Sequence, residues 1–137
     1  MDNKDPYIYR IRSIHKVVDG DTIDADIDLG FDISLTKRIR LAGVDTPESR
    51  TTDAYEKKLG LEVKDWLKHR LEFAKDIIIK TELPDSTEKY GRIIGHLFIN
   101  GEAVSINNKM VTEGYAWEYD GGTKKKDFDL LASRRKK

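Results

Sequence analysis

A strict alternation of apolar and acidic residues after Thr22 constrains the fold more than any other feature of the sequence. A period of two is that of a β-strand with one buried side and one side facing solvent. Gly30 ends the pattern, and the apolar residues that follow it predict a returning strand over 33–41. The inward positions are Ile23, Ala25, Ile27 and Leu29, and the outward positions are Asp24, Asp26 and Asp28.

The same aspartates permit a second interpretation, a calcium-binding loop between two helices. The sixth position of such a loop is glycine and the twelfth is glutamate. Counted from Asp24, this chain has Leu29 and Leu35 at those positions. A hairpin with one face exposed to solvent therefore explains the alternating acids better.

Other elements follow from composition, periodicity and turn residues. Residues 7–18 are rich in Tyr, Ile and Val, which favours a strand. Asp53 and Glu56 resemble a capping box before an amphipathic helix over 55–71, where Gly60 suggests a close approach of helix to sheet. The remaining expected elements are strands at 76–81 and 93–99, a hairpin-type turn at Asn100-Gly101, a helix capped by Ser105 and ended by Gly114, and a last helix from Thr123.

These elements predict an α+β fold, mainly β. Strands with inserted and trailing helices suggest a five-stranded Greek-key barrel of the oligonucleotide-binding (OB) type with about three helices. A length of 137 residues suits a single domain, 1–137, with a core over about residues 7–133. Since the sequence contains no cysteine, disulfides and thiolate zinc sites are excluded.

Charge and hydropathy limit the partners that can be expected. Charged residues make up 36% of the chain but cancel to a formal net charge of zero, so a polyanion must be attracted by local patches. No apolar run is long enough to span a membrane, and the first residues do not form a signal peptide. We expect a monomer that is intracellular, or secreted if a leader has been removed.

Asp21, Asp45 and Glu48 stand out because they lie at turn-like breaks beside apolar, β-branched runs. Two carboxylates, Asp21 and Asp45, together with the carbonyl of Thr46 and waters, can supply the oxygen ligands that Ca²⁺ requires. Arg40 has a planar guanidinium that can bind a phosphate through two parallel hydrogen bonds, and Glu48 lies in the same segment. Metal, carboxylate and arginine suggest phosphoryl chemistry, although each residue alone could be a turn or surface residue.

The order of these residues resembles the signature of the staphylococcal nuclease family. The matching segments are Asp19-Gly20-Asp21-Thr22, Arg40, Asp45-Thr46-Pro47-Glu48 and Lys89-Tyr90-Gly91-Arg92. The resemblance implies the OB-type barrel and a calcium-dependent phosphodiesterase acting on DNA and RNA, preferably single-stranded or locally opened. It also selects Arg40, and not Arg38, as the phosphate clamp.

The resemblance further implies a role for each residue. Glu48 is the general base for in-line attack by water, and the products carry 3′-phosphate and 5′-hydroxyl ends. Calcium is held by Asp21, Asp45 and the Thr46 carbonyl, with Asp19 behind them placing the ion or its waters. Arg40 and Arg92 hold the developing charge, and Lys89, Tyr90 and Tyr119 bind the substrate.

Two other classes of function remain open. A catalytically silent OB-fold module that binds nucleic acid predicts the loss of Arg40, Glu48 or Arg92, yet all are present. A protein-interaction module predicts a sizeable exposed apolar patch without converging acids and arginines. A histidine-based mechanism is not expected, because the three histidines are scattered and unpaired in the sequence.

Overall fold

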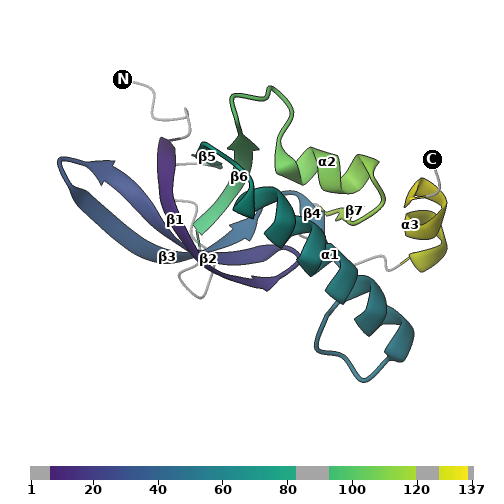
Figure 1. Cartoon of the computed structure of the whole chain (residues 1–137). Helices are drawn as coiled ribbons and strands as arrows, with labels where there is room; N and C mark the ends of the chain where they lie inside the picture. Colours follow the sequence, from purple (N-terminus) through teal and green to yellow (C-terminus); the bar gives the residue numbers. More distant parts are fainter. Residues whose placement is uncertain (1–6, 83–92, 120–126, 136–137) are drawn as a thin grey trace.

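The computed structural model describes residues 7–82, 93–119 and 127–135 (Figure 1). The strands are β1 (Ile8–Asp19), β2 (Thr22–Gly30), β3 (Ile33–Leu41), β4 (Val44–Asp45), β5 (Ile77–Thr81), β6 (Ile93–Ile99) and β7 (Trp117–Glu118). The helices in these ranges are α1 (Ala54–Glu72), α2 (Ile106–Thr112) and α3 (Phe128–Arg135).

Five strands close into a barrel in the order β1-β2-β3-β6-β5. Strand β1 closes it by pairing antiparallel with β5, and β3 pairs parallel with β6 from Ile39↔Ile93 to Leu41↔Gly95. The remaining strands, β4 and β7, form a separate two-stranded sheet. The predicted five-stranded OB-type barrel, mainly β with three helices among the described residues, is therefore confirmed.

The alternation in β2 determines which side of the sheet is buried. Ile23, Ala25 and Ile27 are at most 2% exposed and form part of the core. On the outer side, the Asp24 carboxylate accepts hydrogen bonds from Arg38, and Asp28 accepts one from the Gly30 amide. The aspartates are thus the solvent face of a hairpin, as the alternation indicated, and do not form a calcium loop.

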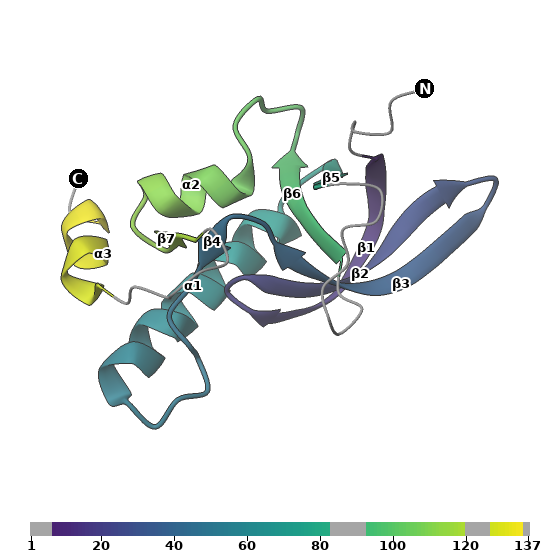
Figure 2. The ribbon, with the colours of Figure 1, turned by 180° about the vertical axis from the view of Figure 1, so that it is seen from behind.

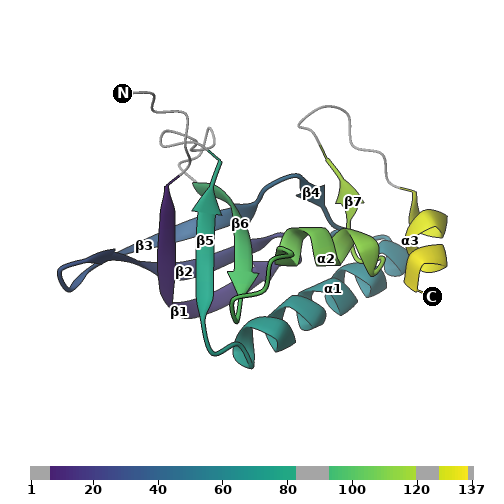
Figure 3. The same cartoon turned by 90° about the horizontal axis from the view of Figure 1, so that it is seen from above.

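The β2–β3 hairpin projects beyond the barrel on the side away from the helices (Figures 1 and 3). At its tip, Phe31 is 97% exposed, and both Phe31 and Asp32 have positive φ, 55° and 63°. Positive φ at both central residues gives a two-residue turn the twist that matches its strands. Leu29, predicted to point inward, is 41% exposed, so the core contains only the inner part of this hairpin.

Helix α1 begins directly after Asp53, as the predicted N-cap requires, but Glu56 does not complete a capping box. The Asp53 side chain accepts hydrogen bonds from the amides of Tyr55 and Glu56, as an N-cap does. The Asp53 amide, the donor in a reciprocal capping box, donates to Thr51 Oγ1. The Glu56 carboxylate accepts a hydrogen bond from the amide of Glu48, in the loop that precedes the helix.

The later elements follow the predicted order with two differences. Ser105 caps α2, and Gly114, with a φ of 84°, follows its end. Asn100 and Gly101 have the left-handed φ of a hairpin turn, but the chain continues into α2 and does not return as a strand. The last helix begins at Phe128, and residues 123–126 lie outside the described ranges.

The close approach of helix to sheet occurs at Gly20 and not at Gly60. A Cβ added at Gly20 would lie 2.6 Å from Val63 Cγ1 of α1. A Cβ at Gly60 would instead meet the backbone of Glu48 and Ser49, in the loop between β4 and α1. Among the described residues, no helix is long and apolar enough to cross a membrane.

Candidate active site

The backbone of the barrel brings the predicted acids and arginine together. The β2–β3 register pairs Thr22 with Arg40, and the Leu41 amide donates to the Asp21 carbonyl at 2.8 Å. The chain then turns at Gly43, with a φ of 74°, and enters β4, which ends at Asp45. The small β4–β7 sheet lies on the helical side of the barrel (Figures 1 and 3).

Arg40 lies between the two acids that the sequence nominated as metal ligands. Its Nη1 is 3.4 Å from Asp21 Oδ2, and its Nη2 is 3.8 Å from Asp45 Oδ1. Nη1 also donates to the Leu41 carbonyl at 2.9 Å. All three side chains are at most 14% exposed. The charges of this cluster are therefore poorly screened by solvent and act strongly on one another.

Arg38 contacts a different acid. Its side chain is 49% exposed and binds Asp24 on the outer face of the hairpin. Because side chains alternate along a strand, positions 38 and 40 share a side of β3, but Arg40 lies at the end of the strand beside the β1–β2 turn. The structure thus brings Arg40, and not Arg38, close to Asp21 and Asp45.

The oxygen donors around Arg40 suit a hard cation in their chemistry. Asp21, Asp45 and Arg40 together carry a formal charge of −1, so a cation would be attracted to the cluster. Thr46, only 3% exposed, follows Asp45 directly. No group of three or more His, Cys, Asp or Glu that could hold a metal was found in the described ranges. Two carboxylates and a carbonyl need waters or substrate oxygens to complete such a site.

Glu48 lies in the loop that follows Thr46, and its side chain is exposed. The Glu48 amide donates to Glu56 Oε2 at 3.1 Å. Next to it, Ser49 Oγ donates to Asp19 Oδ1 at 2.8 Å, and the same oxygen accepts from the Gly20 amide. Asp19 therefore ties this loop to the β1–β2 turn, while its role in placing a metal stays a prediction.

The loop contacts of Glu56, Ser49 and Gly60 were not foreseen from the sequence. The sequence pattern predicts Glu56 in the helix cap and Gly60 against the sheet, whereas both contact the loop before α1. A glycine inside a long amphipathic helix was a usable signal, because it weakens the helix and usually has a packing reason. The partner of that glycine could not be read from local pattern.

The predicted substrate-binding residues are only partly described. Lys89, Tyr90 and Arg92 lie outside the described residues. Tyr119 is half-buried, and its amide donates to the Gly43 carbonyl at 2.9 Å. This bond places the Tyr119 backbone beside the turn that leads to Asp45.

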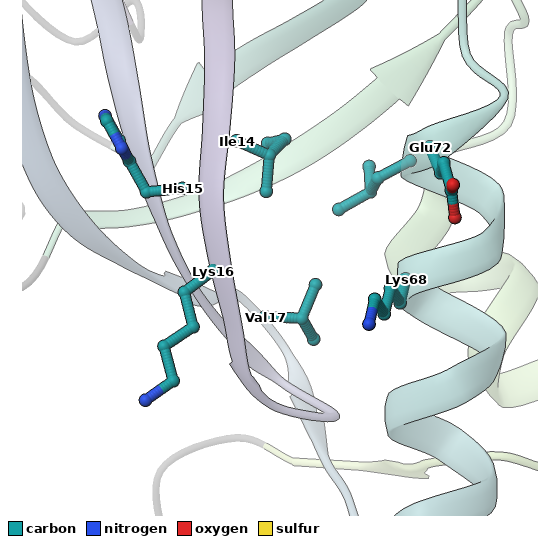
Figure 4. A pocket seen from close by; sticks show the side chains of 7 residues that line it. Ile14, His15, Lys16, Val17, Lys68 and Glu72 are labelled. Atoms are coloured by element: carbon teal, nitrogen blue, oxygen red, sulfur yellow. The ribbon is translucent and has the colours of Figure 1, made fainter.

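A pocket of about 240 Å³ lies elsewhere, between β1 and the C-terminal half of α1 (Figure 4). It shares no residue with the cluster around Arg40. Its lining consists of Ile14, His15, Lys16, Val17, Lys68, Leu71 and Glu72.

Comparison with known proteins gives matches over most of the chain. Residues 38–136 match the family described as staphylococcal nuclease homologue. An uncharacterised protein of Methanocaldococcus jannaschii is 29% identical over 89% of this chain and 65% of its own length. Protein ParB of Escherichia coli is 29% identical over 85% of this chain and 61% of its own length.

A thermonuclease of Staphylococcus hyicus is 33% identical over 74% of this chain and 54% of its own length. The chain thus spans less than two thirds of the length of each of these relatives. The family match contains Arg40 and the segment from Asp45 to Glu48, whereas Asp19 and Asp21 precede it.

Proposed function

The chain belongs to the staphylococcal nuclease family, and on that basis we propose that it is a Ca²⁺-dependent phosphodiesterase that hydrolyses DNA and RNA. The observation that carries the proposal is the position of Arg40. Its guanidinium faces two largely buried carboxylates, at the end of the strand that leads into the segment bearing Glu48. Oxygen ligands for a cation and a guanidinium that can bind phosphate would therefore lie side by side.

The proposed metal ligands are Asp21, Asp45 and the main-chain carbonyl of Thr46. When bound there, Ca²⁺ would polarise the phosphodiester and offset the negative charge that a phosphate adds to the cluster. The position of Asp19 behind the β1–β2 turn supports a role in holding this site, because its carboxylate bonds the Gly20 amide next to Asp21.

The proposed chemistry assigns the proton transfer to Glu48. The carboxylate of this exposed residue would accept a proton from a water that attacks phosphorus in line with the leaving oxygen. A new bond forms between the water oxygen and phosphorus, and the bond from phosphorus to the 5′-oxygen breaks. The leaving 5′-oxygen takes up a proton, which gives 3′-phosphate and 5′-hydroxyl ends.

Arg40 would hold the phosphoryl oxygens as negative charge develops on them. Its guanidinium can do so while its orientation is maintained by the Leu41 carbonyl. Arg92 is proposed near the leaving oxygen by family resemblance alone. Lys89, Tyr90 and Tyr119 are proposed to contact the strand, and stacking on tyrosine favours single-stranded or locally opened substrates.

The two arginines of β3 provide a matched test of the phosphate clamp. Arg40→Lys keeps the positive charge but removes the guanidinium that can form two hydrogen bonds to a phosphate. We expect kcat on denatured DNA to fall by about 100-fold. Arg38→Lys alters an exposed side chain on the outer face, and its kcat should remain within about twofold of wild type.

Equal rates for wild type and Arg40→Lys would contradict the clamp. If the wild-type protein binds single-stranded DNA but does not cut it with Ca²⁺, the chain is a silent OB-fold binding module.

A further inference from the structure

The loop that carries Glu48 lies directly against the first half of α1. It joins β4 to the start of this helix and runs alongside its first turns (Figures 1 and 2). At Gly60, a Cβ would lie 2.5 Å from both the carbonyl carbon and the carbonyl oxygen of Glu48, and 2.7 Å from the Ser49 nitrogen. These atoms are backbone, so they could not rotate away as the end of a side chain could.

One helical turn before Gly60, a second residue of α1 contacts the same segment. Residues four apart on a helix lie on the same face. Glu56 is only 7% exposed, and its Oε2 accepts the hydrogen bond from the Glu48 amide at 3.1 Å. A carboxylate acceptor makes this a charge-assisted bond, which is stronger than a bond between neutral groups.

The other side of the loop is held by the barrel. Ser49 Oγ donates to Asp19 Oδ1 at 2.8 Å, so the residue after Glu48 is fixed to the β1–β2 turn. The backbone of Glu48 is thus held at its amide by Glu56 and packed at its carbonyl against Gly60. Its side chain remains exposed.

We propose that Glu56 and Gly60 are positioning residues that fix the backbone of Glu48 and thereby aim its carboxylate at the attacking water. This inference rests on the proposed nuclease function. A general base must be within hydrogen-bond reach of the proton that it takes, and a displacement of about 1 Å can cost about 100-fold in rate. The same helix therefore supports the barrel with one part of its face and the loop with another.

The test compares Glu56→Ala, Glu56→Gln and Gly60→Ala with Glu62→Ala on Ca²⁺-dependent cleavage of denatured DNA. Glu62 is the matched control, because it lies on the same helix but pairs with Arg135 of α3. We expect Glu56→Ala and Gly60→Ala to lower kcat by about 10- to 100-fold with KM within about twofold. Glu62→Ala should keep the wild-type kcat.

Two features separate positioning from general damage to the fold. Glutamine retains a carbonyl oxygen that can accept from the Glu48 amide, so Glu56→Gln should recover kcat to within about threefold of wild type. A Cβ at position 60 must displace the Glu48 backbone and should lower thermal stability as well, so the kcat of Gly60→Ala is measured well below its own melting temperature, where a loss of kcat reports the displaced loop and not unfolding.

Amide hydrogen exchange at Glu48 measures the contact independently of activity. Exchange should be faster in Glu56→Ala than in wild type and Glu62→Ala. Normal kcat and unchanged Glu48 exchange in Glu56→Ala and Gly60→Ala would overturn this inference while leaving the proposed function intact. Absence of any cleavage by the wild-type protein would overturn the proposed function, and the role of these contacts in catalysis with it.

Discussion

Replacement of Asn107 by leucine should destabilise the fold severely, although the two side chains are similar in size. Asn107 lies on α2, is 1% exposed, and makes three hydrogen bonds to backbone. Its Oδ1 accepts from the Leu97 amide at 3.1 Å, and its Nδ2 donates to the carbonyls of Ala42 at 2.8 Å and Gly95 at 3.2 Å. Asn107 therefore fastens α2 to β6 and to the turn that leads into β4.

The cost follows from the backbone groups left behind. In Asn107→Leu the Gly95 carbonyl keeps the hydrogen bond from the Ala42 amide, at 2.8 Å. The Leu97 amide and the Ala42 carbonyl lose the bonds from Asn107, and each buried polar group left unsatisfied costs about 1–3 kcal/mol. The free energy of unfolding should fall by about 4 kcal/mol, which in a domain of this size lowers Tm by about 10–15 °C.

Asn108 provides the control, because it is the next residue of α2 and is exposed. Asn108→Leu should change the free energy of unfolding by less than about 0.5 kcal/mol. Urea denaturation of both variants and the wild type, followed by circular dichroism, gives the three values. If Asn107→Leu is within about 1 kcal/mol of wild type, the backbone groups find other partners and the argument is wrong.

Further predictions concern packing, pH and metal. Gly20→Ala places a methyl group 2.6 Å from Val63 Cγ1 and should lower the free energy of unfolding, measured by thermal denaturation, by about 1–3 kcal/mol. Unchanged stability would show that α1 can move away. Hydrogen bonds, that from Thr36 foremost, lower the pKa of Asp26 from 3.8 to about 2. Asp26 therefore stabilises the fold above about pH 4, and this contribution is lost as pH falls towards 2. In Asp26→Asn the free energy of unfolding should fall less steeply between about pH 4 and pH 2. The same pH dependence in wild type and variant would contradict the lowered pKa of Asp26. Ca²⁺ at about 100 times its Kd should raise the free energy of unfolding by about 2.7 kcal/mol in wild type and much less in Asp45→Asn. Equal melting temperatures with Ca²⁺ and with a chelator would refute the metal site.

The elements of the barrel could be predicted because their signals are local. The alternation after Thr22 predicts one buried face wherever the strand is placed, and the structure buries Ile23, Ala25 and Ile27, whereas Leu29, predicted inward, is 41% exposed because the end of the hairpin projects beyond the barrel. Asp53 and Ser105 cap their helices through bonds that span only a few residues. The order of the strands, β1-β2-β3-β6-β5, depends on pairings between distant segments, so the local signals indicate the type of barrel but not this order.

The candidate site was predictable as a set of residues but not as an arrangement. The motif order nominated Asp21, Arg40 and Asp45, and the structure brings these three together. Glu56 was misassigned because a local capping rule and a distant contact compete for the same carboxylate. Asn107 and Asn108 look alike in the sequence, and only the packing of α2 on β6 decides which of the two is buried.

The most direct test of the nuclease proposal is the rate at which heat-denatured DNA is cut, measured for wild type and Glu48→Gln with Ca²⁺ and with a chelator. We predict cleavage by wild type that requires Ca²⁺, and a loss of about 100-fold or more in Glu48→Gln, because glutamine cannot accept the proton of water. Cleavage at the wild-type rate by Glu48→Gln would contradict the role of Glu48 as general base. The absence of cleavage by wild type with Ca²⁺ would contradict the proposed function itself.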